Sequence, residues 1–183
     1  FLLIIVNNPR LLNPGPKHSI RQNPIKVLHW NPNSLLAHNG IRIRCIEALN
    51  QIQNYDLIAI TESALHTSIS DEDIHLEGFS PFHRDLPDDM THGGVLLYYK
   101  DNLAVRERPE LQTFNNINVC EITINNKKIT VSVTYRKHNS SKIELETFCD
   151  KYKDMCELVA TDNPLCALHI GNLNCCSSVF LER

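Results

Sequence analysis

A short apolar run that ends on a carboxylate is the feature that most constrains the fold of this chain. Residues 56–61 read Asp-Leu-Ile-Ala-Ile-Thr, and Glu62 follows at once. A run of this length, rich in β-branched residues and bordered by polar ones, predicts a buried strand in a covered sheet. Such a strand would hold Glu62 rigidly at the rim of the sheet, where Mg²⁺ can use a carboxylate ligand. An ordinary surface glutamate after a strand would give the same local pattern.

The overall composition is typical of a globular domain. The chain has 183 residues, of which 42% are hydrophobic and 21% are charged, so it can bury a real core. Its formal net charge is -3, which gives no support to a nucleic-acid partner, although a nuclease needs only a local basic rim. Seven cysteines without a Cys-x-x-Cys spacing favour reduced thiols over a zinc site or disulfides. We therefore expect a nuclear or cytoplasmic protein that is not secreted.

The first 23 residues are expected to be a leader or linker, and residues 24–183 to form one partial domain. The six apolar residues at the start are too few to span a bilayer, so no membrane partner is expected. Asn13-Pro14-Gly15-Pro16 continues neither a helix nor a strand. The chain does not begin with Met, which suggests a fragment or an incomplete gene model.

Apolar strands alternate with two amphipathic helices along the domain. Ile43, Ile46, Leu49 and Ile52 recur at helical spacing and predict a helix from about residue 41 to 54. A second helix is expected to open at a capping box, Ser141-Lys142-Ile143-Glu144. The predicted strands are Ile25–Asn31, Asp56–Thr61, Val95–Tyr99, Asn118–Ile124, Lys128–Tyr135 and Leu165–Ile170. This alternation predicts an α/β fold in which two packed sheets carry helices on their outer faces.

Two other segments are expected to be structural. The stretch from Ser63 to Gly94 is polar, and its acidic run Asp71-Glu72-Asp73 is expected to be a solvated loop or first helical turn, with a metal site as the alternative. His169 lies inside an apolar strand and is expected to be a hydrogen-bonded core histidine rather than a catalytic group. Arg42, Arg44, Lys127 and Lys128 could line a nucleic acid or could be ordinary exposed charges.

Four of the apolar runs end on polar side chains: an amide, a carboxylate, a phenol and a pair of amides. The residues at or just after these ends are Asn31, Glu62, Tyr135, Asn172 and Asn174. Strand ends and the loops after them are where α/β folds place their sites. We therefore expect these side chains to converge on one cleft that binds a metal and a phosphate.

Five short motifs occur in register between about Ile25 and Asn174. They are Trp30-Asn31-Pro32-Asn33-Ser34-Leu35, Ile60-Thr61-Glu62-Ser63, His83-Arg84-Asp85 with His92-Gly93-Gly94-Val95, Thr134-Tyr135-Arg136, and Gly171-Asn172-Leu173-Asn174. On these residues the chain resembles the endonuclease/exonuclease/phosphatase superfamily, and specifically the apurinic-type endonuclease domain of non-LTR retrotransposons. The Asn13-Pro14-Gly15-Pro16 motif also resembles the ribosome-skipping peptide at the start of some of these elements.

The resemblance implies a four-layer α/β/β/α sandwich, incomplete at the C-terminus, and Mg²⁺- or Mn²⁺-dependent hydrolysis of a phosphodiester. Glu62 would bind the metal and Asn31 would help to hold the metal or the phosphate. Tyr135 would donate a hydrogen bond to the phosphate, and Asn174 would orient the attacking water or the phosphate. The implied partner is DNA, nicked for retrotransposition by a polyprotein that also carries a reverse transcriptase.

Asn172 departs from the resemblance, because the family has a catalytic aspartate at this position. A carboxamide accepts a hydrogen bond but cannot act as a base near neutral pH, and loss of a general base typically costs about 10²–10⁴ in rate. The family's closing segment with its Ser-Asp-His-like motif is also not in this sequence. We therefore expect no appreciable nicking of DNA and no rescue by Asn172→Asp alone. A non-catalytic remnant or pseudoenzyme, and a phosphatase of the same fold, are the alternatives.

Overall fold

Two β-sheets form the centre of the molecule, for which the computed structural model describes residues 2–5, 25–84, 86, 90–124, 127–162 and 164–174. The first sheet has five strands, in the spatial order β1 (Leu2–Ile5), β2 (Lys26–Trp30), β3 (Leu57–Thr61), β5 (Val95–Lys100) and β4 (Phe79–Arg84). The second has four, in the order β6 (Ala104–Glu107), β7 (Ile117–Ile124), β8 (Lys127–Tyr135) and β9 (Cys166–Asn172).

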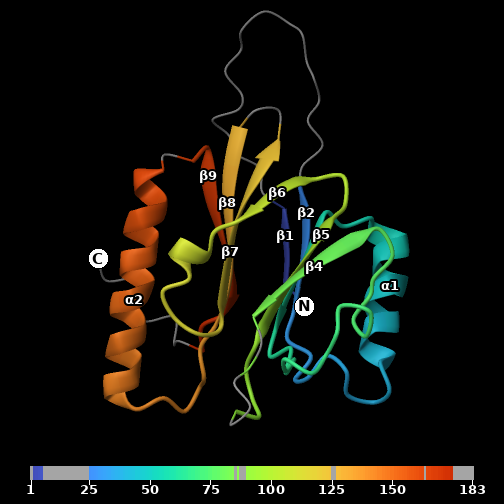
Figure 1. Ribbon diagram of the computed structural model, residues 1–183, viewed down its shortest axis with the longest axis horizontal. Helices are drawn as coiled ribbons and strands as arrows, with labels where there is room; N and C mark the ends of the chain where they lie inside the picture. Colours follow the sequence, from blue (N-terminus) through green and yellow to red (C-terminus); the bar gives the residue numbers. More distant parts are fainter. Residues whose placement is uncertain are drawn as a thin grey trace, which may run out of the picture.

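Helices cover the outer faces of both sheets. Helix α1 (Ile41–Gln53) lies on the first sheet, while helix α2 (Lys142–Thr161) and the short 3-10 helix η2 (Pro109–Leu111) lie on the second. Figure 1 shows the two long helices on opposite sides of the paired sheets. The predicted four-layer α/β/β/α sandwich is therefore confirmed. No helix in the described part of the chain is long and apolar enough to cross a membrane.

Strand alternation separates the core between the sheets from the cores under the helices. Ile129, Val131, Val133 and Tyr135 face the first sheet, as the period-2 pattern predicts. Every residue of β3 is buried, because this strand has the other sheet on one face and α1 on the other. A strand covered on both faces reads as a continuous apolar run, which explains why the run before Glu62 is so distinctive.

Two pairs of parallel strands bring the predicted polar ends to one rim. β2 pairs with β3 so that Trp30 is opposite Ile60, and β8 pairs with β9 so that Tyr135 is opposite Asn172. The carboxyl ends of parallel strands meet at the same edge. The two edges also meet each other, because the Tyr135 hydroxyl is hydrogen-bonded to Glu62 across the sandwich.

Three strands were not expected from the sequence, and all three lie at sheet edges. β4 lies in the polar stretch from Ser63 to Gly94, for which no strand was predicted, and β6 was not predicted either. Edge strands lack long apolar runs because one side meets solvent, and an edge tolerates Pro81 in β4. β1 lies within the first 23 residues, which were expected to be a leader or linker, and it pairs with β2. Asn13-Pro14-Gly15-Pro16 lies outside the described residues.

The two predicted helices are confirmed, with one error in the apolar face of α1. Ile46 is fully buried, but Ile52 is 76% exposed. Residues three apart drift backwards by about 60° per step around a helix of 3.6 residues per turn, so Ile52 has turned away from the sheet. In α2 the capping box is present: Glu144 N donates to Ser141 Oγ at 3.3 Å, and Ser141 N donates to Glu144 Oε2 at 2.6 Å.

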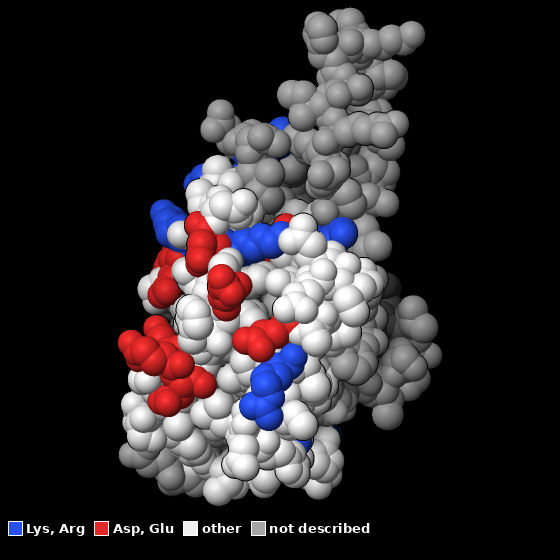
Figure 2. Space-filling model, turned by 90° about the vertical axis from the view of Figure 1, so that its right-hand side faces the viewer, with Lys and Arg blue, Asp and Glu red and all other residues white. Residues whose placement is uncertain are grey.

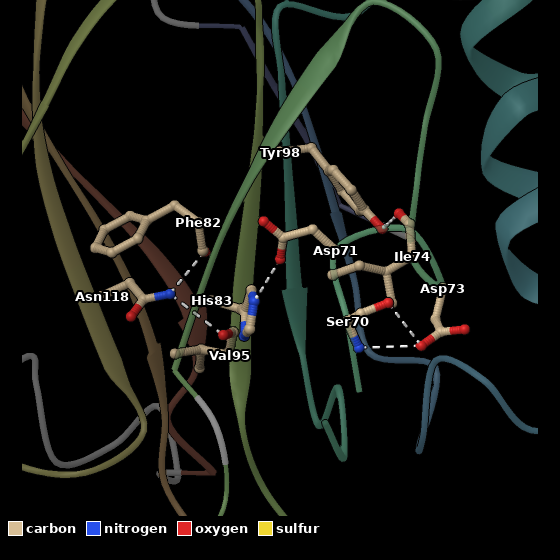
Figure 3. A network of polar contacts seen from close by, with 9 residues as sticks. All are labelled: Ser70, Asp71, Asp73, Ile74, Phe82, His83, Val95, Tyr98 and Asn118. Atoms are coloured by element: carbon tan, nitrogen blue, oxygen red, sulfur yellow. Dashed lines mark hydrogen bonds and ion pairs between the residues drawn. The ribbon is translucent and has the colours of Figure 1, made fainter. Parts of the chain in front are cut away.

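The acidic run forms an exposed turn between β3 and β4. Asp71 contacts His83 Nε2 at 3.0 Å, and Asp73 accepts hydrogen bonds from both the backbone and the hydroxyl of Ser70, each at 3.0 Å (Figure 3). The Ser70–Asp73 pairing is a local side-chain-to-backbone bond of the kind that stabilises turns. The solvated-loop interpretation of this run is therefore confirmed.

Candidate active site

Asn31 and Glu62 lie side by side because they follow adjacent parallel strands. Asn31 Nδ2 donates to Glu62 Oε1 at 2.8 Å, and Asn31 Oδ1 accepts from Asn33 N at 3.1 Å. The loop after β2 also holds the backbone of Glu62, since Ser34 N donates to the Glu62 carbonyl at 2.7 Å. The sequence places these two residues thirty-one positions apart, and the β2–β3 register brings them into contact.

Glu62 has a left-handed backbone conformation, with φ of 56°. This conformation costs a residue with a side chain of order 1–3 kcal/mol and persists only where the surroundings determine it. Here the carbonyl of Glu62 is held by Ser34 N, and Ser63 N donates to the Gly94 carbonyl at 3.3 Å. The buried strand and the turned backbone together aim the carboxylate at the rim.

Tyr135 reaches the same carboxylate from the other sheet. Its side chain is only 5% exposed and is hydrogen-bonded to Glu62. Burial raises the pKa of Tyr135 to about 12, with further contributions from the negative charge of Glu62 and the hydrogen bond to it, while Arg136 acts in the opposite direction. The phenol therefore stays protonated near neutral pH and is available as a hydrogen-bond donor.

Asn172 and Asn174 lie at the rim, and their side chains bond to backbone groups there. Asn172 is the last residue of β9, and its Oδ1 accepts from Asn174 N at 3.2 Å. Asn174 Nδ2 donates to the Arg136 carbonyl at 2.6 Å. The structure thus joins Asn31, Glu62 and Tyr135 directly and places Asn172 on the strand next to Tyr135.

Asn116 is a site residue that the sequence did not reveal. Its Oδ1 accepts from Gly94 N at 2.7 Å, and its carbonyl accepts from Tyr135 N at 2.9 Å. Because Gly94 in turn accepts from Ser63 N, Asn116 connects the backbone at Tyr135 with the backbone next to Glu62. Nothing marks this asparagine in the sequence, since it precedes a strand like many turn residues.

Buried polar groups lie directly beneath the rim. His29 Nε2 is 3.2 Å from Thr61 Oγ1, which links β2 and β3 just below Asn31 and Glu62, and burial lowers the pKa of His29. Asn118 reaches from β7 to the first sheet, where its Nδ2 donates to the carbonyls of Phe82 at 2.9 Å and Val95 at 3.2 Å (Figure 3). The Asn118 contacts link the two sheets under the site, while the His29–Thr61 contact links two strands of the first sheet.

His169 is not part of this cluster. It was predicted to lie in the core, but the structure places it on an exposed face. Its Nδ1 is 2.7 Å from Ser132 Oγ, and its ring lies edge-on to Tyr152 of α2. Leu168 and Ile170 face the core between the sheets, so the alternation of β9 turns His169 to the outer face. The residue is hydrogen-bonded, as expected, but remains exposed.

The donor set around Glu62 fits a hard cation with one protein carboxylate. A carboxylate has about four lone-pair sites, so the hydrogen bonds from Asn31 and Tyr135 leave positions for a metal. Mg²⁺ often takes one or two carboxylates and completes its octahedron with waters and substrate phosphates. No group of three or more His, Cys, Asp or Glu residues gathers anywhere in the described ranges.

The basic residues considered from the sequence lie at opposite ends of the molecule. Arg42 Nη1 donates to the carbonyls of Asn33 and Ser34, so this arginine holds the loop beside Glu62. Lys127 and Lys128 begin β8, about 25 Å along the strand from Tyr135 at roughly 3.3 Å per residue. Figure 2, viewed from the α1 side, shows Lys and Arg interspersed with acidic groups rather than a continuous basic surface.

The fold recurs in solved structures of two endonucleases and a 3′ phosphatase. The chain superposes on the endonuclease domain of TRAS1, a telomere-specific non-LTR retrotransposon, with a TM-score of 0.62 at 19% identity over 85% of this chain. It superposes on the AP endonuclease LMAP from Leishmania major with a TM-score of 0.60 at 14% identity over 72% of this chain. It also matches the 3′ phosphatase NExo from Neisseria, bound to a product DNA hairpin, with a TM-score of 0.61 at 18% identity over 82% of this chain.

These matches cover only part of the known structures. The chain spans 61% of the TRAS1 domain, 47% of LMAP and 58% of NExo. No protein-family profile and no curated protein sequence matches the chain. At these identities the likeness establishes the fold, while the chemistry has to be argued from the side chains at the rim.

Proposed function

We propose that this chain, which has the endonuclease/exonuclease/phosphatase fold, binds a DNA phosphodiester with Mg²⁺ or Mn²⁺ at Glu62 and hydrolyses it slowly. The observation that carries the proposal is the convergence of Asn31 and Tyr135 on the Glu62 carboxylate at the carboxyl ends of strands from both sheets. Nucleases and a phosphatase share this fold, so phosphodiester hydrolysis suits it. The likeness to the TRAS1 domain supports a retrotransposon context, in which the chain would work beside a reverse transcriptase.

Each site residue has a chemical task in this proposal. Glu62 would bind the metal, which when present stabilises the charge on the phosphate and lowers the pKa of a bound water. Asn31 orients the Glu62 carboxylate through its amide. Tyr135, whose pKa is raised by burial and by Glu62, would donate to a phosphate oxygen as charge develops there. Asn174 would orient the water or the phosphate.

The asparagine at position 172 is the reason that we expect hydrolysis to be slow. It shares the inner face and the rim with Tyr135, where a proton acceptor for the attacking water would be useful. Its carboxamide cannot accept that proton near neutral pH, and a missing general base lowers rates by about 10²–10⁴. Asn172 is also the observation that favours the second candidate, a protein that binds DNA and metal without cutting.

The test is the relaxation of supercoiled plasmid DNA, followed on a gel in Mg²⁺, in Mn²⁺ and in EDTA. We expect at most weak nicking that requires the metal and is abolished by Glu62→Gln, a variant of nearly the same shape. Glu157→Gln, the same change at an exposed glutamate near the C-terminal end of α2, is a matched control that should nick like the unmodified chain. Robust nicking that survives Glu62→Gln would contradict the residue assignments.

The alternatives give different results in the same experiment. A binding-only protein would retain DNA and Mn²⁺ affinity that depends on Glu62 but would leave the plasmid supercoiled. A phosphatase would release inorganic phosphate from a 3′-phosphorylated oligonucleotide faster than it nicks plasmid. The NExo structure is the observation that makes the phosphatase test worthwhile.

A further inference from the structure

Arg136 is a buried cation that holds the loop after β9. It follows Tyr135 directly and is only 7% exposed. Its Nε donates to the Leu173 carbonyl at 2.6 Å, one Nη donates to the Lys137 carbonyl at 2.9 Å, and the other donates to the Asn174 carbonyl. One side chain therefore gathers three backbone carbonyls, two of which belong to the loop that carries Asn174.

The backbone of Arg136 completes the same connection. Its N–H donates to the Asn172 carbonyl at 2.9 Å, and its carbonyl accepts from Asn174 Nδ2 at 2.6 Å. These bonds extend the β8–β9 pairing one residue beyond Tyr135 and Asn172. The position of the Asn172–Asn174 segment is thus set by Arg136 from both main chain and side chain.

An arginine is well suited to this task. Its guanidinium presents five N–H donors in a fixed planar fork and keeps its charge when buried, whereas lysine offers donors from a single nitrogen. A buried charge is costly unless it is paired or well hydrogen-bonded. The three carbonyls meet part of this requirement, but they carry no negative charge with which to neutralise the guanidinium.

The charge of Arg136 is not neutralised by an ion pair within the described ranges. The other buried arginine, Arg108, which is 6% exposed, contacts the carboxylates of Glu110, Glu121 and Asp162. Arg136 makes no such contact with a described carboxylate. An unneutralised cation beside Tyr135 and the asparagine loop suits an anionic ligand at this rim.

We propose that Arg136 is a positioning residue that holds the Asn172–Asn174 loop against the end of β8 and offers its charge, which no carboxylate of the described residues pairs, to the phosphodiester of a nucleic acid. This inference rests on the proposed function for its ligand, but the hold on the loop does not. The role differs from that of Arg42, which holds the loop after β2.

The first test is the binding of a fluorescently labelled DNA duplex, measured by anisotropy in EDTA across a range of salt concentrations. Arg136→Gln should weaken binding by about tenfold. It should also make the negative slope of log K against log salt less steep by about one, as expected for one lost phosphate contact. Arg136→Lys should keep the slope, because the charge is conserved. Arg108→Gln is the control: it removes an equally buried arginine and should leave the slope unchanged.

The second test follows the loop without DNA. Amide hydrogen exchange at Arg136 and Asn174 should be about tenfold faster in Arg136→Gln and in Arg136→Lys, because both lose the fork. Each variant is first checked for native circular dichroism. Unchanged exchange in the folded Gln variant would overturn the hold on the loop, and unchanged affinity and slope would overturn the role of the charge. If the unmodified chain binds no DNA, the proposed function is wrong, and so is the assignment of a phosphodiester as the ligand of Arg136. The exchange rates would still show whether Arg136 holds the loop in place.

Discussion

Glu62 and Tyr135 are coupled at the scale of single residues. The carboxylate of Glu62 accepts hydrogen bonds from an amide and from a phenol that belong to different sheets. The negative charge and the hydrogen bond of Glu62 both disfavour ionisation of Tyr135. A measurement on the tyrosine therefore reports on the glutamate, whether or not the chain cuts DNA.

We predict that Glu62→Gln lowers the pKa of Tyr135 from its value of about 12. Removing the carboxylate removes two of the causes that raise this pKa, whereas burial, the largest cause, remains. The pKa should therefore fall but stay above the ordinary value of 10.0. The measurement is an NMR titration of ring-labelled tyrosine, with Tyr135→Phe to assign the signal. An unchanged Tyr135 pKa would show that the two side chains are not in contact in solution.

We also predict that Asn172→Asp tightens the binding of Mn²⁺. The change adds a carboxylate at the rim on the inner face next to Tyr135, and hard cations gain affinity with each added carboxylate oxygen. About a tenfold decrease in Kd is expected, measured by titration calorimetry. Asn102→Asp, at an exposed turn after the end of β5, is the matched control for the change in net charge. Equal gains in both variants would mean that Asn172 does not face the metal.

At the scale of the elements, β9 depends on a close approach to β8 at Gly171. A Cβ atom built on Gly171 would lie 2.0 Å from the Thr134 carbonyl oxygen, which neither strand can relieve without moving. Gly171 is therefore required by strand packing just before Asn172. Close backbone approach is a common reason for a glycine within a strand.

Gly171→Ala should destabilise the fold by about 1–3 kcal/mol, the usual cost of forcing an extra methyl into a packed site. Gly40→Ala is a suitable comparison, because Gly40 has φ of 70° but open space around its hypothetical Cβ. That variant should cost about 1 kcal/mol for the left-handed conformation alone. Urea unfolding monitored by circular dichroism measures both. A smaller loss for Gly171→Ala than for Gly40→Ala would contradict the close approach.

At the scale of the whole molecule, stability should depend on the protonation of buried histidine. Burial lowers the pKa of His29 below its ordinary value of 6.5, so the folded state binds this proton less readily than the unfolded state. Stability contributed by neutral His29 is therefore present above the unfolded pKa and is lost as the pH falls below about 6.5. The free energy of unfolding should decrease between pH 7.5 and 5.5.

The contribution of His29 can be separated from that of other histidines by substitution. His29→Gln retains a hydrogen-bonding group near Thr61 without a titrating ring. Its unfolding free energy should vary less with pH than that of the unmodified chain over the same range. Equal slopes in the His29 variant would contradict a lowered pKa.

The sequence by itself determined the buried strands, the helices and most of the polar residues at strand ends, because local patterns of residues mark each of them. Covered strands such as β3 read as apolar runs, the Ser141–Glu144 capping box marks the start of α2, and the polar residues Asn31, Glu62 and Tyr135 follow their strands visibly. These features predict the layers and name most of the rim, because each depends on residues that are close together along the chain.

Only the tertiary structure decided which of these polar ends touch. The contact between Tyr135 and Glu62 depends on how two sheets pack, and the roles of Asn116 and Arg136 depend on backbone groups in other strands. The edge strands β4 and β6 were missed for a related reason, since one of their sides is open to solvent and leaves little apolar pattern. Contacts between distant segments are set by packing and register, which the local pattern of residues does not record.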